Sequence, residues 1–110
     1  MRSRLLTYFF LFTAYSSLTA LAEELDRNAE FTQANQHYEA EEYEKALKIY
    51  QELSETSLAK EVFYNLGNTQ FRMGKLGAAS LAYRRAVLLD PGMIEAKQNL
   101  QLLNRKLGSL

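Results

Sequence analysis

Apolar residues recur every three or four positions along most of this chain, and no segment alternates apolar and polar residues over the length of a strand. This spacing gathers the apolar side chains on one side of a helix, so it predicts an all-α protein. Gly74 and Pro91 are expected to end two of the helices, because glycine accepts left-handed backbone and proline cannot continue helical hydrogen bonding. The predicted helices cover about residues 25–40, 43–55, 62–73, 76–89 and 93–107.

Two stretches of the chain repeat each other at a constant offset, which brings residues 34–50 onto residues 67–83. The matching pairs are Ala34 and Gly67, Asn35 and Asn68, Tyr38 and Phe71, Ala46 and Ala79, and Tyr50 and Tyr83. Small residues suit positions where two helices cross closely, and large rings fill the space beside them. The pattern predicts two stacked helical hairpins, about residues 27–59 and 60–93, followed by a capping helix at about 93–107.

Residues 1–22 have the features of a signal peptide. Arg2 and Arg4 precede an apolar run at residues 5–14, and small residues stand at Ala20 and Ala22. We therefore expect cleavage after position 22, export to the periplasm, and a mature repeat domain of residues 23–110. The alternative is an inner-membrane anchor formed by residues 1–22, although the apolar run is short against the ~20 residues that a spanning helix needs.

Composition further limits the kinds of partner and chemistry that the chain can have. The 13 basic and 13 acidic side chains balance, so no net charge favours nucleic acid, and the membrane is expected as a partner only if the leader is retained. The chain has no cysteine, which excludes disulfides, thiolate metal sites and a thiol nucleophile. His37 is the single histidine, and no carboxylates have metal-like spacing. No catalytic residue, metal or cofactor is expected.

The second repeat resembles the tetratricopeptide repeat (TPR) signature. The matching residues are Phe63, Leu66, Gly67, Phe71, Gly74, Ala79, Tyr83, Ala86 and Pro91. The first repeat departs from this signature at Glu30, Ala34 and Leu58, which replace an aromatic residue, a glycine and a proline. The resemblance implies right-handed helical hairpin repeats and a non-enzymatic protein-interaction adaptor.

Two short sequence segments resemble a narrower group of TPR proteins. Residues 63–69 (FYNLGNT) and 83–91 (YRRAVLLDP), followed by Asn99-Leu100, resemble the exported TPR proteins of aerotolerance (Bat) operons. That resemblance implies an adaptor of an envelope complex. The alternatives are a self-associating assembly subunit, since two repeats are few for a continuous core, and a TPR factor of another envelope pathway such as cytochrome maturation or pilus assembly.

The first helix of each hairpin lines the concave side of such stacks, so exposed residues there are candidates for holding a protein or peptide partner. The candidates are Phe31, Asn35, Tyr38, Tyr64, Asn68, Phe71 and Arg72. The TPR resemblance makes Asn35 and Asn68 the strongest, because an asparagine amide can donate to and accept from a peptide backbone at once. Tyr38 and Phe71 have the alternative of filling core space.

Overall fold

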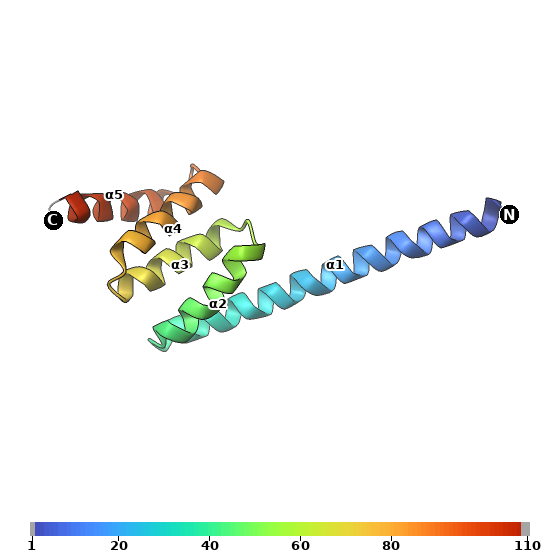
Figure 1. Ribbon diagram of the computed structural model, residues 1–110, viewed down its shortest axis with the longest axis horizontal. Coiled ribbons are helices and arrows are strands. Elements are labelled where there is room, and N and C mark those ends of the chain that lie inside the picture. The colour runs from blue at the N-terminus through green and yellow to red at the C-terminus, as the bar shows by residue number, and fades with distance from the viewer. Residues whose placement is uncertain (1, 109–110) are drawn as a thin grey trace.

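The computed structural model describes residues 2–108, which form helices and turns without any strand. Met1, in the predicted leader, and Ser109 and Leu110, at the end of the predicted repeat domain, lie outside the described residues. The helices are α1 (Arg2–Glu39), α2 (Tyr43–Thr56), α3 (Lys60–Arg72), α4 (Leu76–Leu89) and α5 (Ile94–Gly108) (Figure 1). The prediction of an all-α fold is confirmed.

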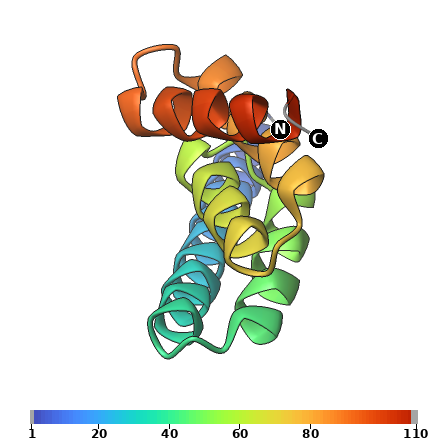
Figure 2. The same cartoon turned by 90° about the vertical axis from the view of Figure 1, so that its left-hand side faces the viewer.

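The helices form a stack in which each packs on the next in sequence. The C-terminal half of α1 pairs with α2, α3 pairs with α4, and α5 lies on α4, while α1 also reaches α3 (Figures 1 and 2). Apolar stripes at helical spacing explain this arrangement, because each helix has to bury its stripe against a neighbour. The result is the helical hairpin architecture that the sequence repeat predicts.

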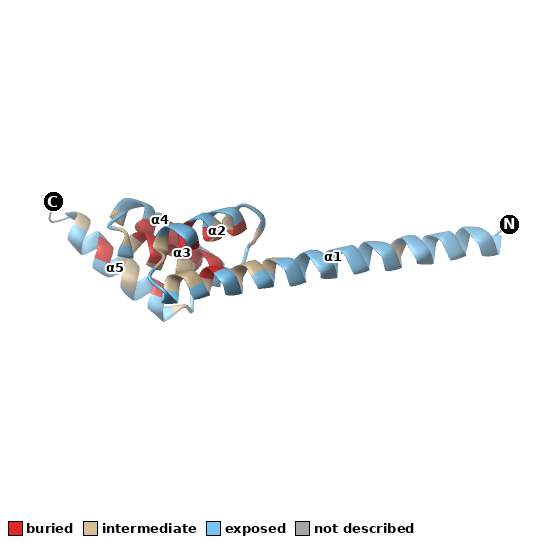
Figure 3. Cartoon of the chain, turned by 90° about the horizontal axis from the view of Figure 1, so that it is seen from below, coloured by how far each residue is buried: buried red, intermediate tan, exposed pale blue. Residues whose placement is uncertain are grey.

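The first helix differs from the prediction. We expected it to begin near Leu25, but α1 runs without interruption from Arg2 to Glu39. No glycine or proline breaks the backbone in this range. Hydroxyl side chains such as Thr7 and Ser17 bond to carbonyls one turn earlier, which a helix accommodates. The part before residue 25 projects away from the stack and is exposed almost throughout (Figure 3).

The two hairpin turns use the same backbone geometry. Gly74 has a φ of 75°, as the sequence predicts for a residue that ends a helix. Glu41, the equivalent position of the first repeat, has a φ of 59° and is the one non-glycine residue with positive φ among residues 2–108. The first repeat therefore keeps the left-handed conformation at Glu41, even though a side chain makes that conformation unfavourable.

Two tyrosines occupy the centre of the stack. Tyr50 in α2 is 1% exposed, and Tyr83 in α4 is 2% exposed. Each lies against the small residue of its own repeat, Ala34 or Gly67, where the helices approach closely. A Cβ atom added at Gly67 would lie 2.8 Å from the Tyr83 ring, so this approach needs glycine.

Candidate functional site

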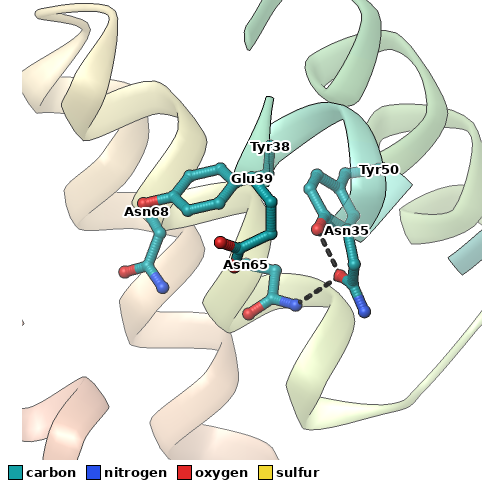
Figure 4. A pocket seen from close by; sticks show the side chains of 6 residues that line it. All are labelled: Asn35, Tyr38, Glu39, Tyr50, Asn65 and Asn68. Carbon is teal, nitrogen blue, oxygen red and sulfur yellow. Dashed lines mark hydrogen bonds between the residues drawn. The ribbon is translucent and has the colours of Figure 1, made fainter. Parts of the chain in front are cut away.

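Two neighbouring cavities on the α1 and α3 side of the stack form a groove. The first, shown in Figure 4, has a volume of about 300 Å³ and the second about 230 Å³, and Tyr38 and Asn68 line both. The first is also lined by Asn35, Glu39, Tyr50 and Asn65. The second is also lined by Phe71, Arg72, Tyr83, Asn99 and Leu102. We call these two cavities together the groove.

Asn35 and Asn68 hold equivalent places in the groove and make equivalent hydrogen bonds. Tyr50 Oη donates to Asn35 Oδ1 at 2.5 Å, and Tyr83 Oη donates to Asn68 Oδ1 at 2.6 Å. A second amide donates to each oxygen: Asn65 Nδ2 to Asn35 Oδ1 at 3.0 Å, and Asn99 Nδ2 to Asn68 Oδ1 at 3.5 Å. Figure 4 shows the two bonds to Asn35 Oδ1, from Tyr50 and from Asn65. The sequence repeat is thus a repeat of polar contacts as well as of packing.

These bonds change what the asparagines can offer a ligand. We expected each amide to donate and accept at once, but each Oδ1 already accepts from two donors inside the protein, which fills both of its lone pairs. Within residues 2–108 no acceptor bonds to Nδ2 of Asn35 or of Asn68. The groove therefore presents amide donors, which suit the carbonyl oxygens of an extended chain.

Three further candidates border the groove. Phe71 packs at the edge of the cluster that contains Tyr83 and Leu103, and the Lys106 ammonium lies 5.4 Å from its ring centroid. Arg72 Nε donates to Tyr43 Oη at 3.0 Å, which fixes the guanidinium over the Tyr43 ring. Tyr38 packs edge-on to the same Tyr43 ring, with centroids 5.4 Å apart. The structure thus brings Asn35, Tyr38, Asn68, Phe71 and Arg72 together.

Phe31 and Tyr64 lie elsewhere, because each packs against the central tyrosine of its repeat. The Phe31 ring is 6.0 Å from the Tyr50 ring, and the Tyr64 ring is 5.9 Å from the Tyr83 ring, between centroids. Neither residue lines the groove. Phe31 and Tyr64 occupy equivalent positions in the two repeats and have the same packing role. The sequence analysis had placed both on the exposed face of their helices.

Several groove residues were not among the sequence candidates. They are Glu39, Tyr50, Asn65, Tyr83, Asn99 and Leu102. Asn65 could have been found, since it lies three positions before Asn68 and so shares its helix face. Asn99 follows Asn65 by about one repeat length, so α5 contributes to the groove as the first helix of a third hairpin would.

Burial keeps the two central phenols protonated. It raises the pKa of Tyr50 to about 12, although the neighbouring Asn65 amide acts in the opposite direction. Burial also raises the pKa of Tyr83 far above its usual range. Both hydroxyls consequently remain donors to the asparagines throughout the ordinary pH range.

We expect the free energy of unfolding to fall as the pH rises above about 10. An unfolded tyrosine loses its proton near pH 10, whereas Tyr50 in the folded chain keeps it to about 12, so the protonated form favours folding. This contribution is complete below about pH 10 and declines as the pH rises toward 12. Urea unfolding at about pH 8 and about pH 11 measures it, and Tyr50→Phe should flatten the decline. A free energy that rises with pH would contradict the prediction.

The fold and the groove define a class: a stack of helical hairpin repeats with a polar groove along one side. The tetratricopeptide repeat family model matches residues 60–93, which span α3, α4 and the turn before α5. This match and the all-helical architecture support a TPR protein, whose repeats generally bind protein partners and carry no catalytic activity. No match to a curated protein was found.

Within residues 2–108 no three side chains of histidine, cysteine, aspartate or glutamate lie together as a metal would require. The His37 ring instead lies 3.3 Å from a Glu42 carboxylate oxygen in the turn after α1.

Proposed function

We propose that this protein is a non-enzymatic adaptor that holds an extended segment of a partner protein in the groove. The single observation that supports this most is the pair of amide donors at Asn35 and Asn68, whose oxygens are held by tyrosines while their Nδ2 groups remain for a ligand. An extended segment carries unpaired carbonyls along its length, and two donors one repeat apart can meet two of them.

We further propose that the adaptor acts in the cell envelope. Residues 5–22, which we call the apolar segment, begin with the apolar run at 5–14 and contain no buried residue; together with the preceding arginines they support export. α1 is also the one described helix long and apolar enough to cross a membrane, a property that a signal sequence shares. The resemblance to exported TPR proteins of aerotolerance operons supports an envelope complex, with cytochrome maturation or pilus assembly as alternative settings.

Photo-crosslinking in cells tests the groove. A photoreactive residue placed at Glu39 or Arg72, which border the groove, should give a discrete crosslinked species. The same residue at Glu52 or Arg84, exposed on α2 and α4, should not. Crosslinks of equal yield at all four positions would contradict binding in the groove. Mass spectrometry identifies the crosslinked segment of the partner, and a peptide of that sequence is then synthesised for binding measurements.

We expect Asn68→Asp to weaken binding of that peptide about tenfold. Aspartate keeps the oxygen that accepts from Tyr83 but lacks the Nδ2 donor, and its charge repels a peptide carbonyl. Asn35→Asp should act alike. The matched control is Asn104→Asp, because Asn104 Oδ1 also accepts a hydrogen bond, from Ser80 Oγ at 3.5 Å, and lies outside the groove. Fluorescence anisotropy measures the affinities, and equal losses in all three variants would contradict the proposal.

A further inference from the structure

The exposed large apolar side chains of the stack are concentrated at one end. Among residues 40–108 they are Leu58, Leu81, Leu88, Leu89, Ile94 and Leu102. Four of these six flank the α2–α3 and α4–α5 turns, and Leu58 and Leu88 are 84% and 76% exposed. Leu58, Leu88 and Leu89 line one hollow of about 290 Å³ together with Phe63 and Arg85. Exposed apolar side chains gathered in this way indicate a contact surface.

The two turns are held side by side. The Lys60 ammonium, just after the α2–α3 turn, pairs with the carboxylate of Asp90 in the α4–α5 turn. Asp90 also accepts a hydrogen bond from the backbone of Gly92 at 2.9 Å, which orders the second turn. We call the two turns, with Leu58, Leu88, Leu89 and Ile94, the turn end.

The turn end lies beside α1 just after its apolar segment. Glu24, Arg27 and Asn28 of α1 share a cavity of about 360 Å³ with Ser57 and Ala59 of the α2–α3 turn. The α4–α5 turn lies at the same end of the stack, on the side toward which α1 projects (Figure 1). At 1.5 Å per residue, this cavity begins within about 10 Å of the last apolar residues of the segment.

The apolar run at residues 5–14 is short for a membrane, but α1 continues through the mixed residues 15–22, and the helix as a whole is long and apolar enough to cross one. Residues 5–22 in helical form cover about 27 Å, close to the ~30 Å of a bilayer's hydrocarbon core. The headgroup layer beyond the core is about 5–8 Å deep. When the segment crosses a bilayer, the turn that adjoins Glu24 therefore lies at the headgroup layer of the leaflet from which α1 emerges.

We propose that the turn end contacts the lipid bilayer that α1 crosses, with Leu58 and Leu88 entering the headgroup layer. This rests on the envelope location proposed above, with α1 retained as an anchor. The contact is apolar rather than driven by net charge, because Arg27 shares its cavity with Glu24 and Glu61. Arg85, which lines the leucine hollow, supplies a cation for lipid phosphates. A second attachment point beside α1 limits tilting of the stack and presents the groove in one orientation.

Single-cysteine labelling tests this contact, since the chain has no cysteine of its own. An environment-sensitive dye is attached to Leu58→Cys or Leu88→Cys in the full chain, reconstituted in vesicles of phosphatidylethanolamine and phosphatidylglycerol. Lipids with a quencher in the headgroup region report proximity. Leu81→Cys and Leu102→Cys are matched controls, exposed leucines away from the turn end. Phe10→Cys with a quencher in the acyl chain reports whether α1 is inserted.

We expect strong acyl-chain quenching at position 10, and headgroup quenching several-fold higher at positions 58 and 88 than at 81 and 102. Quenching at position 10 with equal values at the other four positions would overturn the contact while leaving the anchor in place. Absence of quenching at position 10 would overturn the anchor and, with it, the contact, whereas the groove is tested separately by the Asn68→Asp peptide affinities. If the dye at positions 58 and 88 instead reports an apolar environment that depends on protein concentration and not on lipid, the lipid contact would be overturned. The turn end would then be assigned to contact with a second copy of the chain.

Discussion

Replacing Tyr83 by alanine is expected to lower the free energy of unfolding by about 3–5 kcal/mol. Tyr83 is 2% exposed, fills the space left by Gly67, and packs in the cluster that joins α4 to Leu103 of α5. Its removal would leave a cavity where three helices meet. Small domains have a total stability of about 5–15 kcal/mol, so the variant should be close to unfolding at about 37 °C. Urea titration followed by far-UV circular dichroism measures the change.

The matched control is Tyr83→Phe, which keeps the ring and removes the hydroxyl that donates to Asn68. We expect this variant to lose about 1 kcal/mol, the usual net value of one hydrogen bond. A loss for Tyr83→Ala no larger than that of a single hydrogen bond would contradict the central position of the ring. Equal losses in the two variants would mean that the hydroxyl, and not the packing of the ring, stabilises the stack.

Two glycine-to-alanine substitutions are expected to have opposite effects. In Gly67→Ala the new Cβ would lie 2.8 Å from Cδ1 and Cε1 of the Tyr83 ring, so a buried ring would have to move. We expect a loss of about 1–3 kcal/mol. Gly77 is also helical, in the first turn of α4, but a Cβ there meets no atom within 4 Å. Gly77→Ala should therefore gain about 0.5–1 kcal/mol from helix propensity.

Melting temperatures of the two variants measured side by side give the comparison. Both substitutions add the same methyl group to a helical glycine, so their difference isolates the helix crossing at Gly67. A stabilising Gly67→Ala would show that α3 and α4 tolerate a wider separation than the structure has. It would also weaken the explanation of why a small residue recurs at the same place in both repeats.

The candidate site could be predicted in part. The repeat offset placed Asn35 and Asn68 as equivalents, and both line the same cavity. Their partners could not be read from the sequence, because Tyr50 and Tyr83 belong to the following helix of each hairpin. Contacts across a hairpin depend on how the helices cross. The same dependence turned Phe31 and Tyr64 toward the central tyrosines and away from the groove.

The local features of this protein could be predicted from its sequence: the all-α class, the turn at Gly74, the helix end before Pro91, and the bounds of α2 and α4 almost to the residue. These follow from apolar spacing and backbone preferences, which act over short stretches of chain. Three further features became known from the folded chain: α1 continues unbroken from Arg2, both asparagine oxygens are occupied, and the turn end adjoins the apolar segment. The last two arise where residues distant in sequence meet, and helix packing sets their geometry.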